Sequence, residues 1–179
     1  IRIVIANLSK NLYICKMIQR ILSSKIEQLG DKYPIITLTG PRQSGKTTLL
    51  KALFGHLPYV SLEDIDNRFL AGNDPRGFLN NFPQGAFLDE VQRVPELFSY
   101  FQGIVDAGNV QFVLSGSHNF LLMENITQTL AGRTALLNLL PFSFHELNSA
   151  DIVFETVDEY IYSGFYPRLH DKKISPNDF

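Results

Sequence analysis

A run of glycines and small polar residues in the first third of the chain has the spacing of a phosphate-binding loop. Residues 40–48 read GPRQSGKTT and fit the pattern G-x-x-x-x-G-K-S/T. Gly40 and Gly45 allow the backbone to wrap closely, so that successive N–H groups face a phosphate. Lys46 is expected to neutralise the β- and γ-phosphates of a nucleotide, and Thr47 to bind Mg²⁺ through its hydroxyl. The residues predicted to contact the nucleotide are the loop and the residues directly after it: Gly40, Pro41, Arg42, Gln43, Ser44, Gly45, Lys46, Thr47 and Thr48.

The segments on either side of this loop have the composition that such a site requires. Residues 33–40, YPIITLTG, form a short apolar run typical of a strand buried on both faces, and residues 45–57 read as a helix. A helix that begins at the loop directs its N-terminal N–H groups and positive dipole end at the same anion. The alternative is a glycine-rich turn that only caps a helix.

Two adjacent carboxylates follow an apolar run in residues 86–92, which read AFLDEVQ. A phosphate-loop site needs an acid at the end of a neighbouring strand to hold the metal ion, and Asp89 has that position. Glu90 could polarise an attacking water molecule as a general base, and the alternative is a charge that faces solvent. A competing pair, Glu63 and Asp64, follows a shorter and more polar run. We therefore predict Asp89 as the acid on the metal side and Glu90 as the base.

Polar residues also follow the apolar run at residues 110–117, which read VQFVLSGS. Ser115, Ser117 and Asn119 are expected near the γ-phosphate, where one of them could orient the attacking water. The alternative is that the serines only cap the helix that follows.

Arg133, in the stretch TLAGRTA, is the only arginine between Arg93 and Arg168. It could reach a phosphate as an arginine finger, either in its own chain or from a neighbouring copy. The alternative is a structural ion pair.

Apolar runs alternate with helical patterns along the rest of the chain. We predict strands at 33–40, 59–64, 85–90, 110–117 and 134–142. We predict helices at 17–29, 45–57, 65–72, 75–82, 95–108, about 118–130, and over most of 143–162. This alternation predicts an α/β fold in three layers, with a mostly parallel central sheet of about five strands.

The first predicted helix, over residues 17–29, has apolar residues at helical spacing. Arg20, Lys25 and Glu27 fall outside this apolar stripe. We expect them on the solvent side of the helix.

The composition excludes several classes of protein. The length of 179 residues fits one domain, and 45% hydrophobic with 19% charged residues is ordinary for a globular chain. Cys15 is the only cysteine, which rules out an internal disulfide or a cysteine-based zinc site and favours a reducing, cytoplasmic location. No apolar run reaches about 18 residues, which argues against a membrane span.

The formal net charge of −2 is unevenly distributed. Residues 1–60 hold nine Lys or Arg against two Asp or Glu, a net charge of +7, and the remaining residues carry −9. A basic N-terminal third could bind nucleic acid. The alternative is that phosphate binding accounts for part of this charge and solvated helix faces for the rest.

The two ends of the chain differ from its centre. Residues 1–16 precede the clear helical pattern, and we expect an upstream or added segment there. Residues 17–168 are predicted to form the ATPase domain, and the polar residues 169–179 to begin a linker toward a further C-terminal domain.

Five sequence blocks, in their joint order and spacing, resemble a large prokaryotic family of predicted ATPases of the AAA+ superfamily. They are LTGPRQSGKTTLL, AFLDEVQRVPELF, FVLSGSHNFLL, LAGRTALLNLLPFSFHEL and GFYPR. The resemblance implies a P-loop NTPase fold with Walker A at residues 40–47, Walker B at 87–90 and a sensor position at 115–117. It also implies that Arg133, in the family's L-x-G-R block, is functionally placed. Members normally carry a C-terminal domain of uncharacterised function after the ATPase core.

These observations predict an ATP-binding domain that hydrolyses ATP with Mg²⁺ and couples the cycle to a partner or to a further C-terminal domain. A homo-oligomer is compatible with an arginine finger from a neighbour. The alternative is a nucleotide-gated switch or scaffold with negligible hydrolysis. Such a switch could also associate with DNA. No membrane partner is expected.

Overall fold

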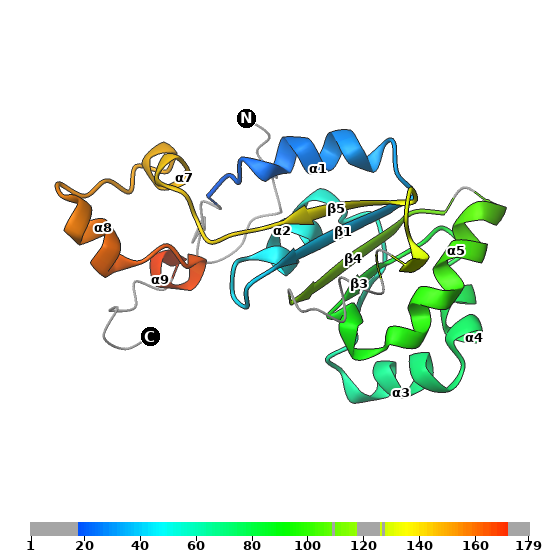
Figure 1. The fold of residues 1–179 in the computed structure, drawn as a ribbon. Helices are drawn as coiled ribbons and strands as arrows, with labels where there is room; N and C mark the ends of the chain where they lie inside the picture. Colours follow the sequence, from blue (N-terminus) through cyan, green and yellow to red (C-terminus); the bar gives the residue numbers. More distant parts are fainter. Residues whose placement is uncertain (1–17, 109, 118–125, 127, 172–179) are drawn as a thin grey trace, which may run out of the picture.

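The computed structural model describes residues 18–108, 110–117, 126 and 128–171 (Figure 1). The expected segment 1–16, Asn119 and most of the helix expected near 118–130 lie outside the described residues. Of the expected linker, only residues 169–171 are described.

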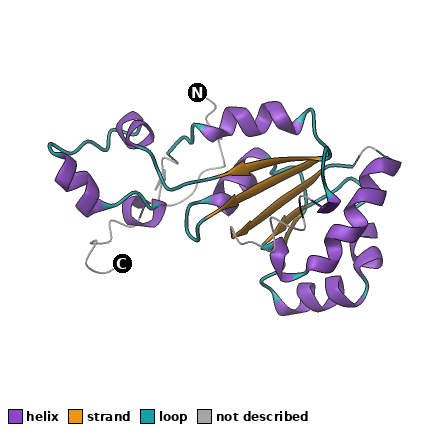
Figure 2. Cartoon of the chain, viewed as in Figure 1, coloured by secondary structure: helices purple, strands orange, loops and turns teal. Residues whose placement is uncertain are grey.

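The centre of the fold is a parallel sheet of five strands (Figure 2). The strands are β1 (Ile35–Gly40), β2 (Tyr59–Ser61), β3 (Phe87–Asp89), β4 (Phe112–Ser117) and β5 (Thr134–Asn138). Their order across the sheet is β2-β3-β4-β1-β5, and every pair of neighbours is parallel. Each strand lies within a predicted run, so the predicted α/β fold is confirmed. Because the strands are parallel, all their carboxyl ends lie at one edge of the sheet.

Helices cover both faces of this sheet (Figure 1). One face carries α1 (Leu22–Gly30) and α2 (Lys46–Leu53), and the other carries α3 (Ile65–Asn73), α4 (Pro75–Asn80) and α5 (Phe98–Ala107). Two single 3₁₀ turns, η1 (Val91–Arg93) and η2 (Pro95–Leu97), connect β3 to α5. The short helices α7 (Phe144–Ser149), α8 (Val157–Ser163) and α9 (Pro167–Asp171) lie beyond the carboxyl ends of the strands.

Successive residues of β1 face opposite sides of the sheet, and each side has its own core. Ile35 belongs to the cluster that includes Phe98 of α5. Ile36 belongs to the cluster that includes Ile26 of α1 and Leu50 of α2. All six residues of β1 are buried, as the continuous apolar run predicts for a central parallel strand.

The expectation of a mostly helical segment over residues 143–162 is wrong in its middle. Ser143 and Thr156 each form a capping box with the glutamate three residues later. Each box starts a separate short helix, because it satisfies the free N–H groups of a helix terminus. The residues between α7 and α8 therefore form a connection rather than a helical turn.

The first helix also begins later than expected, at Leu22. Arg20 lies ahead of it and is 8% exposed, so its expected position on the solvent side is wrong. In the described part of the chain, no helix is long and apolar enough to cross a membrane.

Candidate functional site

The predicted phosphate loop connects the carboxyl end of β1 to the first residue of α2. Gly40 has φ +150°, and a Cβ atom there would lie 2.2 Å from the carbonyl oxygen of Leu139. Gly45 has φ +92°, a conformation that side chains other than glycine rarely adopt. Both glycines of the motif are therefore required by the backbone path that brings the loop to the start of α2.

Lys46 folds back across this loop. Its side chain is buried, and its Nζ donates hydrogen bonds to the carbonyl oxygens of Gly40 (3.1 Å) and Pro41 (2.8 Å). Burial lowers the pKa of Lys46, while the carboxylates of Glu90 and Asp89 raise it in part. A phosphate next to the ammonium would favour its charged form in the same way as these carboxylates.

Asp89 is the centre of the hydrogen-bond network at the edge of the sheet. It is 5% exposed, and its Oδ2 accepts hydrogen bonds from Thr47 Oγ1 (2.8 Å) and the Tyr59 hydroxyl (3.1 Å). Its Oδ1 accepts a hydrogen bond from Ser115 Oγ. The structure thus brings together Thr47 and Asp89, the two predicted metal ligands, although they are 42 residues apart in sequence.

These oxygen atoms are of the kind that Mg²⁺ binds. Protein side chains usually supply only one or two of its ligands, while phosphate oxygens and water supply the rest. Within the described ranges, no group of three or more His, Cys, Asp or Glu side chains could hold a metal ion. Thr47 and Asp89 supply one hydroxyl and one carboxylate, a set that could hold a cation whose other ligands are phosphate oxygens and water.

Glu90 follows Asp89 but has a different environment. Its backbone is left-handed, with φ +58°, and its side chain lines a cavity together with Lys46 and Thr47. Gln92 Nε2 donates a hydrogen bond to Glu90 Oε2. The carboxylate of Glu90 is thus accessible at the site, but it is already paired.

Two serines leave buried oxygen atoms beside the loop. Ser117 pairs with Gly40 in the register of β4 and β1, and Ser44 lies within the loop itself. Neither Ser44 Oγ nor Ser117 Oγ has a hydrogen-bond partner among the described residues. Unpaired buried hydroxyls at this point are consistent with a polar ligand such as phosphate, since buried polar groups are normally satisfied.

A cavity of about 460 Å³ opens over the loop. Most of the predicted contact residues line it, and so do Glu63 and Arg168. Arg168, on α9, lies in the block GFYPR, for which the sequence predicted no role. Tyr59 is a second residue that sequence reasoning missed, because nothing in the motif indicates that β2 lies next to β3.

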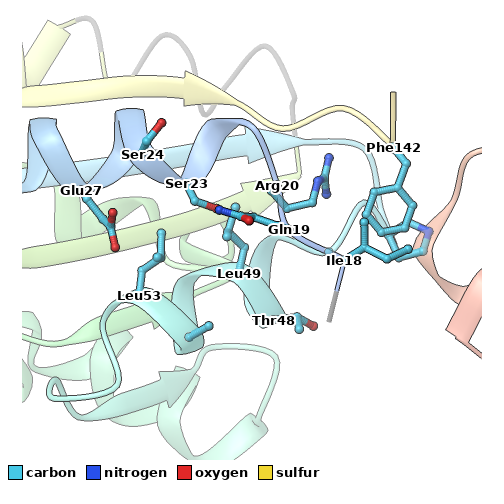
Figure 3. Close-up of a pocket in the computed structure, with 13 residues that line it drawn as sticks. Ile18, Gln19, Arg20, Ser23, Ser24, Glu27, Thr48, Leu49, Leu53 and Phe142 are labelled. Carbon is cyan, nitrogen blue, oxygen red and sulfur yellow. The ribbon is translucent and has the colours of Figure 1, made fainter. Parts of the chain in front are cut away.

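A second cavity of about 450 Å³ shares Gly45 and Thr48 with the first and lies between α1 and α2 (Figure 3). Glu27 and Ser23 of α1 face it from one side, and Leu53 of α2 from the other. Its lining is more apolar than that of the first cavity.

Arg133 does not lie at this site within the same chain. Its carbonyl oxygen accepts a hydrogen bond from Ile35 N, at the amino end of β1, whereas the loop begins at the carboxyl end. Five residue steps of a strand separate these ends by about 17 Å. The guanidinium is held by Asp106 instead, with hydrogen bonds of 2.8 Å and 2.7 Å. The structure therefore contradicts an arginine finger within the same chain. The observed contact is the alternative, a structural ion pair with Asp106.

The basic residues of the first sixty positions have different environments, and Lys25, Lys32, Arg42 and Lys51 are exposed. Residues 1–17, which hold three of the nine basic side chains, are not described. Arg20 and Lys46 are buried, at 8% and 5% exposure. These two charges are not presented to a polyanion in solvent.

A model of the family described as "AAA domain" matches residues 32–148. Two curated relatives, uncharacterized proteins of Mycobacterium bovis and Mycobacterium tuberculosis, are each 30% identical over 142 residues. The matches cover 76% of this chain and 32% of each relative. The chain thus spans about a third of the length of the curated relatives that it matches.

Solved structures share the fold at low sequence identity. The Walker-type ATPase of Pyrococcus abyssi matches with a TM-score of 0.53 and 19% identity, covering 83% of this chain and 63% of that chain. A signal transduction ATPase with numerous domains and a tetratricopeptide repeat sensor, from Pyrococcus horikoshii, matches with a TM-score of 0.56 and 15% identity. That match covers 88% of this chain and 30% of the other. At these identities the likeness concerns the fold.

Proposed function

Because this chain belongs to the AAA domain family, we propose that it binds ATP together with Mg²⁺ at the carboxyl edge of the sheet and hydrolyses it. The observation that carries the proposal is the hydrogen bond of 2.8 Å between Thr47 and Asp89. It joins the last residue of the predicted Walker A motif to an acid of the predicted Walker B motif. Membership of the family supports a nucleotide-binding, ATPase-like domain. The contacts at the site support the assignment of Thr47 and Asp89 to the metal side.

Some side chains of the site bind the phosphates and the metal ion, and others activate the attacking water. Loop N–H groups and Lys46 bind the phosphates, while Thr47 and Asp89 hold the metal side. The bound cation would neutralise charge that develops on the phosphate oxygens. Glu90 takes a proton from the attacking water, and Ser115 or Ser117, beside the γ-phosphate, orients that water.

We assign the base of the nucleotide to the cavity between α1 and α2. It adjoins the phosphate cavity at Gly45 and Thr48, and Leu49 and Phe142 give it apolar walls. An apolar cleft with a few polar groups is the usual form of such a subsite.

Coupling to a partner, to a further domain or to a second copy also belongs to this proposal. The match covers 32% of the length of each curated relative, which supports work shared with other parts of a longer protein. Arg133 lies at the opposite edge of the sheet with its side chain 30% exposed, where it could serve the site of another copy rather than its own.

The proposal is tested by comparing ATP binding and turnover in the wild type, Lys46→Ala and Glu90→Gln. Lys46→Ala should lose ATP binding, because the ammonium is the main charge facing the phosphates. Glu90→Gln should bind ATP as the wild type does, yet lose turnover by about 100-fold or more, the usual contribution of a general base. A wild type that binds no ATP in calorimetry, with Mg²⁺ present, contradicts the proposed function.

One observation favours the alternative of a nucleotide-gated switch. The Glu90 carboxylate is paired with Gln92, which competes with water for the base. Under this alternative the wild type binds ATP but shows no turnover at any protein concentration. Gln92→Ala distinguishes the two functions, since turnover should rise if the pairing only restrains an active base.

A further inference from the structure

Arg20 contacts the phosphate loop and two segments that follow much later in the sequence, α7 and the residues after β5. Its Nη1 donates to the carbonyl oxygen of Ser44 in the phosphate loop (2.8 Å), and its Nε to Glu146 of α7 (3.0 Å). Its Nη2 donates to the carbonyl oxygens of Leu140 (2.5 Å) and Pro141 (3.4 Å), after β5. The side chain is 8% exposed and projects beside the cavity bordered by Phe142 and α2 (Figure 3).

Glu146 holds this guanidinium in place. Its side chain is buried, and its Oε1 accepts hydrogen bonds from Arg20 and from the backbone N–H of Ile21 (2.8 Å). Its Oε2 accepts the N–H of Ser143 (2.8 Å). Because every oxygen of the carboxylate is engaged, the arginine has one defined position rather than several.

The contact with Ser44 concerns the peptide that joins Ser44 to Gly45. A trans peptide is planar, so the carbonyl of Ser44 and the N–H of Gly45 point in opposite directions. Arg20 binds that carbonyl on one side, which turns the Gly45 N–H to the other side. Gly45 has no side chain that would restrict rotation of this peptide. A fixed hydrogen bond to its carbonyl removes that freedom.

We propose that Arg20 is a positioning residue for phosphate recognition, which fixes the Ser44–Gly45 peptide so that the Gly45 N–H is directed at a nucleotide phosphate. The inference rests on the proposed function, because it concerns the same site. Arg20 itself touches neither the phosphate nor the reacting water. Its effect passes through one peptide of the loop.

The test measures binding of inorganic tripolyphosphate and of ATP, with Mg²⁺, to wild type and Arg20→Lys. Tripolyphosphate isolates phosphate recognition, because Arg20 also borders the cavity assigned to the base. Lysine keeps the charge but cannot reach Ser44, Glu146 and the segment after β5 with one ammonium group. We expect binding of both ligands to weaken about tenfold, as for loss of a charge-assisted hydrogen bond.

Two further measurements separate positioning from a general structural effect. Arg76→Lys, at an exposed arginine on α4, should leave both affinities unchanged. In the wild type, tripolyphosphate should shift the amide resonance of Gly45 in an NMR titration. In folded Arg20→Lys, judged by circular dichroism and thermal unfolding, that shift should be reduced more than those of other loop amides.

The outcomes distinguish this inference from the proposed function. A wild type that binds neither ligand overturns both. A wild type that binds, beside a folded Arg20→Lys with affinities within twofold, overturns only the role of Arg20. If Arg20→Lys does not fold, Glu146→Gln replaces it, with a smaller loss expected in the same direction and unchanged affinity counting against the inference. A Gly45 amide that does not respond to tripolyphosphate in the wild type overturns the inference without any variant.

Discussion

Two arginine–carboxylate pairs lie at opposite ends of the central strands. Arg133 and Asp106 form two parallel hydrogen bonds, with side chains 30% and 49% exposed. Arg20 and Glu146 form one hydrogen bond of 3.0 Å, with side chains 8% and 6% exposed. By pair geometry alone, the exposed pair would be ranked as the stronger.

The difference shows that the surroundings of an ion pair matter more than the pair itself. Water competes for the charges of Arg133 and Asp106, so an exposed pair contributes little to stability. Arg20 and Glu146 have lost most of their water, and backbone groups from three segments complete their hydrogen bonds. Removing either partner of such a pair leaves an uncompensated charge in the interior.

The largest expected effect is on stability and comes from Glu146→Ala. This variant leaves the Arg20 guanidinium buried without its carboxylate, so the free energy of unfolding should fall by about 3 kcal/mol. Urea denaturation followed by circular dichroism measures it. If the free energy of unfolding falls by no more than an exposed pair contributes, the buried and exposed pairs do not differ in stability as expected.

Acid should reduce the contribution of the buried pair. Burial by itself raises the pKa of Glu146, but hydrogen bonds from the Ser143 and Ile21 N–H groups and from Arg20 lower it below its ordinary value of 4.5. A carboxyl with a lowered pKa in the folded state stabilises the protein above its unfolded pKa, and this is lost as the pH falls through the folded pKa.

The stability difference between wild type and Glu146→Gln should therefore be complete at neutral pH and shrink below pH 4.5. Denaturant midpoints of both proteins across this range measure it. A stability difference that stays constant as the pH falls well below 4.5 contradicts the lowered pKa of Glu146.

A smaller and conditional effect is expected for Arg133→Ala. Because Arg133 lies at the edge of the sheet opposite the site, ATP affinity should match that of the wild type. Turnover per molecule should rise with protein concentration in the wild type and stay flat in the variant, if Arg133 serves another copy. Equal turnover loss at every concentration would instead indicate an effect within one chain. Mixing Arg133→Ala with Lys46→Ala then tests whether activity returns in a shared site.

The smallest effect is expected for Asp106→Asn, which removes the carboxylate charge of the exposed pair. The hydrogen bond from Arg133 lowers the pKa of Asp106, yet both side chains are open to solvent. The urea midpoint should therefore be nearly unchanged in moderate salt. A loss comparable to that of Glu146→Ala would show that exposure does not separate the two pairs.

Much of the candidate site could be predicted from the sequence because its residues belong to short local patterns. The spacing of Gly40, Gly45 and Lys46 specifies a loop conformation that few other residues allow, and both glycines have positive φ. Asp89 could be chosen over Glu63 because a longer apolar run precedes it. The family match confirms the resemblance that these blocks indicated.

Other parts of the site depend on contacts that no local pattern reveals. Arg20 was expected on the solvent side, because helical spacing describes only the helix and not what packs ahead of it. Tyr59 reaches Asp89 because β2 pairs with β3, and the sequence does not state the order of strands. Arg168 lines the cavity from α9, more than one hundred residues after the loop.

The sequence by itself determined the glycine-rich loop, the position of Asp89 at the end of a buried strand and the alternation of strands and helices, since each depends on neighbours within a few residues. Only the tertiary structure decided which charges meet. In the parallel sheet, Thr47 lies beside Asp89 at the carboxyl ends of the strands, and Arg133 lies at the amino ends. Chain packing buried Arg20 against the loop and α7. The physical reason is that burial and pairing depend on all the segments that converge on a side chain, whereas the sequence lists only those next to it in the chain.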